Sequence, residues 1–203
     1  MVQKFEIKKW QSHFFISNFC THSHLVILKN KVYNEKVMLL FEGPDDKFRA
    51  SAGAFITNKE RTAVLAFERI NRKGSRQLPQ GGIKIYETPV DGIYRELNEE
   101  TGLEPKDLIL LGEYPEWITY ELPEKLRSKK HGRGQTQKFF FFEFQGDELE
   151  IDLHNVDDEE FSEYFWVEPS DIVNKTVNFR KGIYKKLVKY FDENFRRDIK
   201  EKN

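Results

Sequence analysis

Short apolar runs separated by polar breaks fill most of the chain and predict a protein rich in β-strands. Residues 51–58 (SAGAFITN) and 62–70 (TAVLAFERI) are typical of two strands joined by a turn at Asn58–Glu60. Residues 138–144 (KFFFFEF) predict a buried strand, and a shorter strand is expected at 164–169. A further strand opens the segment DLILLGEYPEWITYELP and leads into less regular chain.

Two stretches have helical periodicity instead. In residues 177–195 the apolar side chains recur at the spacing of an amphipathic helix: Ile183, Leu187, Tyr190 and Phe191. An earlier, acidic helix has Ile93, Tyr94 and Leu97 available for burial and ends at Gly102, a typical left-handed cap. Strands interrupted by two substantial helices predict an α/β protein with a mixed sheet between helices.

The first 44 residues differ from the rest and are interpreted as an N-terminal extension of unknown role. Apolar runs at 24–30 (HLVILKN) and 36–43 (KVMLLFEG), joined by a polar VYNE segment, predict a β-hairpin or two strands. Turn-forming and charged residues at Gly43–Asp46 mark a boundary. The predicted division of the chain is an extension, a domain and a tail: 1–44, 45–195 and 196–203.

Charge and cysteine content restrict the possible partners. The net charge is −1, from 33 basic and 34 acidic residues, so no global field directs the chain to nucleic acid or to a membrane. Affinity for a polyanion must be local, and basic loops are expected at 71–77 and 127–137. The single Cys20 excludes an intramolecular disulfide, and no apolar run approaches the ~20 residues that span a bilayer. A cytoplasmic protein without a membrane partner is expected, and its oligomeric state stays open.

Three carboxylates share one face of the acidic helix. Glu96, Glu99 and Glu100 stand at positions i, i+3 and i+4. Because like charges at that spacing repel, a bound cation is the simplest reason for such a face. Mg²⁺ is usually held by a few carboxylates together with the phosphates of a substrate. The spacing therefore points to phosphate chemistry and disfavours a merely solvated surface helix.

These glutamates belong to a longer pattern in Gly81–Leu103 (GGIKIYETPVDGIYRELNEETGL) that resembles the signature of the Nudix hydrolase family. That signature is G-x5-E-x7-R-E-U-x-E-E-x-G-U, with U an aliphatic residue, and the match has no gaps. Nine fixed positions are filled: Gly81, Glu87, Arg95, Glu96, Leu97, Glu99, Glu100, Gly102 and Leu103. The resemblance implies an α/β/α sandwich with a mixed sheet, to which the apolar runs before residue 44 add an N-terminal extension that contains β-strands.

Fragments outside the signature resemble the branch that contains bacterial RNA pyrophosphohydrolase and dinucleoside polyphosphate hydrolases. They occur in the family's order over about residues 47–195: KFRASAG, LPQGGI, EWITYELP, GQTQKFF, EEFSEYFWV and VNFRKGIYKKL. The sequence departs from the branch at Lys84–Tyr86, where a polar turn with glycine is usual, and in its N-terminal extension. Both departures bear on the choice of substrate more than on the chemistry.

The resemblance implies roles for the signature residues. The expected ligands of two or three Mg²⁺ or Mn²⁺ ions are Glu96, Glu99, Glu100, Glu160 from the fragment EEFSE, and a backbone carbonyl around Gly81–Gly82. Either Glu99 or Glu160 is expected to be the general base, and the sequence does not choose between them. Arg95 is expected to pair with Glu87 and a helix glutamate and so to hold the catalytic site in shape. Glu87 and Gly102 are structural in this interpretation.

The branch also implies substrate contacts. Arg49 and Lys138 correspond to phosphate-contacting positions, with Gln80 beside them, and could hold the phosphate chain. Arg69 and Phe179 match a pair that stacks on an unpaired base. Two structural alternatives stay open: an ordinary lysine at the start of a strand for Lys138, and a core residue at the start of a helix for Phe179.

The predicted substrates are the 5′-triphosphate or diphosphate end of RNA and dinucleoside polyphosphates, which share a nucleoside attached to a chain of phosphates. Two alternatives remain: a Nudix hydrolase of another nucleoside diphosphate derivative such as a sugar nucleotide, and a non-catalytic nucleotide- or RNA-binding module. The complete glutamate set speaks against the module, since a repulsive carboxylate cluster adds little to binding alone. Zinc at Cys20, His22 and His24 is disfavoured because a structural zinc site needs four ligands.

Overall fold

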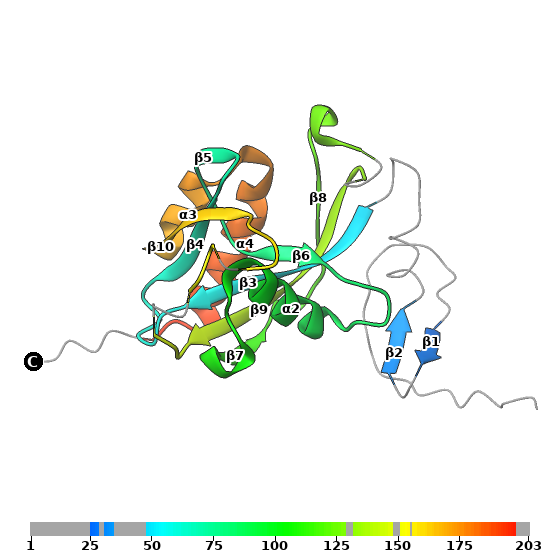
Figure 1. The fold of residues 1–203 in the computed structure, drawn as a ribbon, viewed down its shortest axis with the longest axis horizontal. Helices are drawn as coiled ribbons and strands as arrows, with labels where there is room; N and C mark the ends of the chain where they lie inside the picture. Colours follow the sequence, from blue (N-terminus) through cyan, green and yellow to red (C-terminus); the bar gives the residue numbers. More distant parts are fainter. Residues whose placement is uncertain are drawn as a thin grey trace, which may run out of the picture.

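A mixed β-sheet with helices on both faces forms the body of the protein, as the sequence predicts (Figure 1). The computed structural model describes residues 25–28, 31–34, 48–128, 132–147, 151–154 and 156–197. Within these residues the main sheet has eight strands, and its central pair, β3 (Phe48–Thr57) and β9 (Gly134–Phe144), is parallel. The other strand pairs of this sheet are antiparallel.

The strand order is β10–β4–β3–β9–β7, with β5 paired to β4, β6 to β3 and β8 to β9. The remaining strands are β4 (Val64–Arg69), β5 (Arg72–Gln77), β6 (Gln80–Gly82), β7 (Leu108–Glu113), β8 (Ile118–Glu121) and β10 (Phe161–Val167). The helices are α2 (Pro89–Thr101), α3 (Pro169–Lys175) and α4 (Asn178–Asn194), with 3₁₀ turns η1 (Pro105–Asp107) and η2 (Glu124–Leu126). No helix in the described part of the chain combines the length and apolar character needed to cross a membrane.

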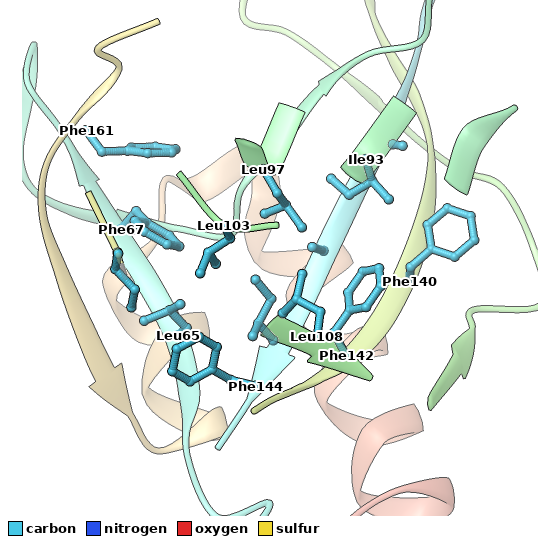
Figure 2. Close-up of a cluster of buried hydrophobic side chains, with 14 of the residues drawn as sticks. Leu65, Phe67, Ile93, Leu97, Leu103, Leu108, Phe140, Phe142, Phe144 and Phe161 are labelled. Carbon is cyan, nitrogen blue, oxygen red and sulfur yellow. The ribbon is translucent and has the colours of Figure 1, made fainter. Parts of the chain in front are cut away.

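The phenylalanine run of β9 supports two cores because successive side chains of a strand point to opposite faces. Within residues 139–144, the even-numbered phenylalanines pack in the cluster of Figure 2 with Ile93 and Leu97 of α2. The odd-numbered phenylalanines pack in a second cluster with Leu187 and Phe191 of α4. Each fully buried phenylalanine stabilises the fold by roughly 1.5–3 kcal/mol. One short sequence run therefore anchors both helical layers to the sheet.

Helix α2 begins and ends at residues that the sequence marks. The hydroxyl of Thr88 accepts a hydrogen bond from the amide of Asp91 at 3.2 Å, and Pro89 occupies the first turn. Gly102 has φ 72° and donates its N–H to the carbonyl of Asn98 at 3.1 Å. The predicted left-handed cap is confirmed, and it fixes where the acidic face of the helix ends.

A loop is predicted for residues 71–77, but residues 72–77 form a strand, β5. Their polar, basic composition favours a loop, but Glu68 and Arg76 are register partners in an antiparallel ladder between β4 and β5. The Glu68 carboxylate closes the turn by accepting the amide N–H of Gly74 at 2.8 Å. Gly74 has φ 77°, which glycine adopts without steric cost. Pairing with a neighbouring strand thus outweighs local composition.

The N-terminal hairpin is shifted from its predicted position. Strands β1 (Leu25–Leu28) and β2 (Lys31–Asn34) are antiparallel, so the second strand uses the segment predicted as the connection. Only residues 29 and 30 separate the two strands, which is the length of a tight hairpin turn. The predicted strand at 36–43, the boundary at 43–46 and the Cys20–His24 cluster lie outside the described residues. The 127–137 loop is shortened, because β9 already begins at Gly134.

Candidate active site

The guanidinium of Arg95 joins the loop after β6 to helix α2. Its Nε and Nη2 donate to the two carboxylate oxygens of Glu87 at 2.8 and 3.0 Å. Its Nη1 donates to Glu96 at 2.8 Å and to Glu99 at 2.6 Å, while Nη2 also reaches the carbonyl of Gly82 at 2.8 Å. Such two-pronged pairing fixes geometry as well as charge. The structure therefore brings together Arg95, Glu87 and two helix glutamates, as the sequence predicts.

The electrostatics of this network follow from burial and pairing. The carboxylate of Glu87, followed by those of Glu96 and Glu99, raises the pKa of Arg95 above its ordinary value despite partial burial. Burial raises the pKa of Glu87, but hydrogen bonds from Arg95 and from the Lys84 amide bring it below its ordinary value. Burial raises the pKa of Glu96, and Arg95 only partly offsets this. Arg95 thus stabilises several carboxylates that would otherwise repel one another.

The two glycines that open the signature leave room for side chains from opposite directions. A Cβ on Gly81 would lie 1.8 Å from Cδ of Glu96, and a Cβ on Gly82 would lie 2.0 Å from Nη2 of Arg49. Real Cβ contacts are never that short, so neither position accepts alanine without displacing a charged side chain. Strand β6 therefore has Glu96 against one glycine and Arg49 against the next.

Glu100 is the buried member of the acidic face. It is 3% exposed, and its Oε2 has no hydrogen-bond partner in the structure. Burial raises its pKa well above the ordinary value, and the carboxylates of Glu160 and Glu96 add to this effect. A buried, unpartnered carboxylate oxygen is costly, and a divalent cation is the partner that carboxylate oxygens favour. The residues present therefore fit the divalent ion that the signature implies.

The carboxylates do not yet converge as a finished ligand set. Among the described residues, no group of three His, Cys, Asp or Glu side chains stands in metal-binding geometry. Nη1 of Arg95 holds Glu96 through Oε1 and Glu99 through Oε2. The second oxygen of each carboxylate is not bonded to Arg95 and could serve an ion while Arg95 keeps its contacts. The ligand set stays a prediction.

Glu160 reaches the helix from a distant segment. Its carboxylate pairs with Arg69 at 2.7 Å, and its carbonyl accepts the amide N–H of Ile70 at 3.1 Å. Two residues earlier, the amide of Asp158 donates to the carbonyl of Glu99 at 3.0 Å. The structure thus brings three segments together next to the buried Glu100: residues 156–160, named here the acidic loop, the end of β4 and the end of α2.

Lys84 is a contact that the sequence reasoning missed. Its ammonium pairs with Glu99 at 3.3 Å, and its amide donates to Glu87 at 2.8 Å. It lies in the Lys84–Tyr86 segment, where the chain departs from the branch and where Tyr86 has φ 71°. Only the position of a lysine inside the signature loop could have indicated this contact.

Lys138 contacts none of the signature glutamates among the described residues. Its ammonium donates to the carbonyls of Tyr114 and Pro115 at 2.7 and 3.2 Å and pairs with Glu113 at 2.9 Å. The residue is buried at the start of the phenylalanine run. In this arrangement the ammonium is bonded to groups at and just after the end of β7. A contact of Lys138 with phosphate stays a prediction.

A second polar group lies on the other side of β6 and is named here the amide–aromatic cluster: Gln80, Tyr120, Gln135, Gln137 and Phe179. Gln135 accepts from the hydroxyl of Tyr120 at 2.6 Å and from Nε2 of Gln80 at 3.0 Å. Nε2 of Gln137 donates to Gln80 at 2.8 Å. The ring of Phe179 stacks on Tyr120, with centroids 5.6 Å apart and planes inclined by 17°.

The structure gives separate partners to the two residues predicted to stack on a base. Arg69 pairs with Glu160, whereas Phe179 stacks on Tyr120. Sequence reasoning included Gln80 and Phe179 but missed Tyr120, Gln135 and Gln137. The alternation G-Q-T-Q at the start of β9 is the signal that could have found the glutamines, since residues two apart share a strand face.

Comparison with known proteins decides the family. The NUDIX domain family matches residues 47–187. The chain belongs to the Nudix family. An RNA pyrophosphohydrolase of Zymomonas mobilis is 34% identical over 148 residues, which cover 71% of this chain and 95% of that protein. An RNA pyrophosphohydrolase of Erythrobacter litoralis is 38% identical over 152 residues, covering 72% and 92%.

Solved structures show the same fold at lower identity. A Caenorhabditis elegans Ap4A hydrolase in a binary complex has a TM-score of 0.55 and 16% identity, covering 71% of this chain and 98% of that one. The Escherichia coli dihydroneopterin triphosphate pyrophosphohydrolase has a TM-score of 0.56 and 17% identity, covering 70% and 98%. The protein is accordingly a Nudix hydrolase with the α/β/α sandwich that the signature implies.

Proposed function

We propose that this Nudix hydrolase cleaves a phosphoanhydride bond at the 5′-triphosphate or diphosphate end of RNA, or in a dinucleoside polyphosphate. The observation that carries the proposal is the buried, unpartnered carboxylate oxygen of Glu100 beside Glu96 and Glu160. RNA pyrophosphohydrolases with 34% and 38% identity over most of their length support the choice of substrate. The catalytic domain proposed is 45–195, and a cytoplasmic location fits a chain with one cysteine.

The proposed ligands of Mg²⁺ or Mn²⁺ are Glu96, Glu99, Glu100, Glu160 and a carbonyl of Gly81 or Gly82. When bound, the ions supply positive charge that offsets the charge on the phosphoryl oxygens and the leaving group. Arg95 positions the glutamates and does not touch the substrate, since its donors are used by Glu87, the helix glutamates and Gly82. The general base that takes a proton from the attacking water is Glu99 or Glu160.

Substrate contacts are proposed around β6. Arg49 lies against Gly82, on the face of β6 that also carries Gln80. Its charge partly offsets the rise in the pKa of Glu96, so it is placed to bind a phosphate near the carboxylates. Gln80 and Phe179 belong to the amide–aromatic cluster, whose amides and ring can bind a base by hydrogen bonds and stacking. Lys138 and Arg69 reach a phosphate or a base only if they leave Glu113 and Glu160.

The decisive experiment is a substrate panel with Mg²⁺: 5′-triphosphorylated RNA, diadenosine tetraphosphate, ADP-ribose and a sugar nucleotide, with product identification. We expect turnover of the first two. Glu100→Gln and Glu99→Gln should each lower kcat by about 10²-fold or more, because each removes a charged oxygen from the metal site. Glu160→Gln should lower kcat by a similar factor, because Glu160 is proposed as a metal ligand or as the general base.

Glu193→Gln is the matched control, since Glu193 lies on α4 and, among the described residues, its carboxylate makes a single ion pair, with Lys189 at 3.8 Å. Full activity of both Glu99→Gln and Glu100→Gln would show that the site is misassigned. Turnover of the sugar nucleotide or ADP-ribose alone would favour the other enzymatic alternative. No turnover of any substrate by the wild type would favour a binding module.

A further inference from the structure

We propose that the turn between β4 and β5 binds the internucleotide phosphates of an RNA substrate, downstream of its 5′ end. The name basic turn is used here for residues 69–76, RINRKGSR, which comprise the last residue of β4, the two-residue connection and most of β5. It contains no acidic residue and four basic ones: Arg69, Arg72, Lys73 and Arg76. The whole chain has a net charge of −1, so this concentration of positive charge is local. The inference rests on the proposed function and selects RNA over a dinucleoside polyphosphate.

A backbone hydrogen bond holds the basic turn beside the candidate active site, and a contact with a side chain of β4 braces it. The amide of Ile70 donates to the carbonyl of Glu160 at 3.1 Å, which ties the start of the turn to the acidic loop. The amide of Gly74 donates to the carboxylate of Glu68 at 2.8 Å, and the left-handed φ of Gly74 closes the far side. A turn fixed at both ends presents its side chains in one arrangement, which lowers the entropy lost on binding.

Two of the four cations already have partners. Arg69 pairs with Glu160 at 2.7 Å, and the guanidinium carbon of Arg76 lies 3.8 Å from the ring centre of Phe165. Across the ladder, the carboxylates of Glu68 and Glu163 are in register with Arg76, not with Arg72. No carboxylate in the described part of the chain pairs with Arg72 or Lys73. As far as the described residues go, these two cations are available to bind an anion from outside the protein.

The register directs Arg72 toward the candidate active site. Arg72 stands opposite Arg69 at the end of the β4–β5 pairing, just past a register shift between Glu68 and Arg69, and opposed residues project from the same face. Because Arg69 reaches Glu160 from that face, Arg72 projects on the side where the acidic loop lies. Phosphates bound at Arg72 and Lys73 would therefore belong to a substrate whose reacting end lies at the carboxylates.

A single-stranded polynucleotide matches this surface best. Its backbone has one negative charge per nucleotide, and cationic grooves follow such a backbone without reading sequence. Ile70, at the tip of the same turn, is 51% exposed and offers an apolar contact to a ribose or base. A dinucleoside polyphosphate has its charges only between the two nucleosides, at the reacting centre. It has no downstream phosphate for the basic turn.

The test measures steady-state kinetics of the full chain with 5′-triphosphorylated RNA of two and of eight nucleotides, and with diadenosine tetraphosphate. Arg72→Gln/Lys73→Gln should raise KM for the longer RNA about 5- to 20-fold and leave kcat nearly unchanged. The KM for diadenosine tetraphosphate should change less than about twofold. The dependence of log(kcat/KM) on log[salt] for the longer RNA should become less steep by about 1.4, since each phosphate contact on a single strand contributes roughly 0.7.

The control is Lys185→Gln/Lys189→Gln, which removes the same charge from the exposed face of α4 and should leave the length dependence intact. Arg72→Lys should keep KM for the longer RNA close to the wild-type value, because binding a phosphate backbone depends on positive charge more than on a guanidinium. An unchanged KM for the longer RNA, or an equal rise for RNA and diadenosine tetraphosphate, would overturn the proposal. Turnover of either substrate by the wild-type protein would support the proposed function even if the basic turn does not bind RNA.

Discussion

Strand β6 separates two regions that have different origins in the sequence. On one side, Glu96 lies against Gly81, and the carboxylates around Arg95 come from one 23-residue segment, Gly81–Leu103. On the other side, Gln80 joins the amide–aromatic cluster, whose members come from β6, β8, β9 and α4. Adjacent residues of a strand point to opposite faces, so β6 contributes Gln80 to one region and Gly81 to the other.

The difference separates chemistry from selectivity. The region around Arg95, called here the local region, needs only helix spacing and a loop to assemble its charges. The same segment can therefore occur in proteins that act on different substrates. The long-range cluster depends on three strands and a helix arriving in register, and its neutral amides and rings suit recognition better than catalysis. Substitutions in the local region should therefore act mainly on kcat, and substitutions in the cluster mainly on KM.

Among the variants that compare the two sides of β6, the largest effect is expected from Gly81→Ala. Its Cβ would lie 1.8 Å from Cδ of Glu96, so either the strand or the carboxylate must move. A displacement of about 1 Å at a catalytic group can cost about 10²-fold in rate. We expect kcat to fall by roughly that factor, with a loss of about 1–3 kcal/mol in the free energy of unfolding from overpacking. Enzyme kinetics and urea denaturation measure the two quantities.

Gly182→Ala is the matched control, since a Cβ there meets no atom within 4 Å. Replacing a glycine inside a helix by alanine should stabilise the protein by about 0.5–1 kcal/mol and leave kcat unchanged. If Gly81→Ala also keeps full activity, the close approach of β6 to Glu96 does not matter for catalysis, and the local region is less tightly built than the contacts indicate.

Sequence reasoning recovered the local region because its information is local. The ends of α2 and the burial of Ile93 and Leu97 follow from spacing within one helix. The contacts of Arg95 were expected from the resemblance to the family signature, which lies within the same segment. Strand β5 was interpreted as a loop because its composition is polar, and only its ladder with β4 makes it a strand. Tyr120 and Gln135 meet through the β8–β9 pairing, which no short-range pattern reveals.

An intermediate effect is expected from Arg95→Lys, which keeps the charge and removes the planar fork. One ammonium cannot replace the hydrogen bonds that Arg95 makes to Glu87, Glu96, Glu99 and Gly82. We expect kcat to fall about 10-fold, less than for Gly81→Ala, because the carboxylates stay but lose their alignment. The free energy of unfolding should fall by about 1–3 kcal/mol.

Arg196→Lys tests whether any arginine in an ion pair behaves this way. Arg196 pairs with Asp192 at 2.9 Å and Glu168 at 3.4 Å near the surface. Exposed pairs contribute roughly 0.2–1 kcal/mol, so stability and kcat should hardly change. Equal losses for the two variants would mean that Arg95 contributes to general stability and does not position the active-site glutamates.

Of the three variants that compare the two sides of β6, Phe179→Ala is expected to have the smallest effect on kcat and the largest relative effect on KM. Loss of one base–aromatic stack costs roughly 1–3 kcal/mol, so KM for a triphosphorylated RNA should rise by about 5-fold or more. We expect kcat to change less than about threefold, because the carboxylates around Arg95 are untouched. Steady-state kinetics with RNA and thermal unfolding of both proteins provide the comparison.

Phe179→Leu then separates base stacking from simple core packing. Leucine keeps an apolar side chain against Tyr120 but has no aromatic face. If Phe179 recognises a base, leucine should leave KM as high as alanine does while recovering much of the lost thermal stability. If Phe179 is a core residue, KM should be unchanged in both variants, and only stability should differ. Recovery of both quantities by leucine would place selectivity elsewhere and make the amide–aromatic cluster a structural element of the fold.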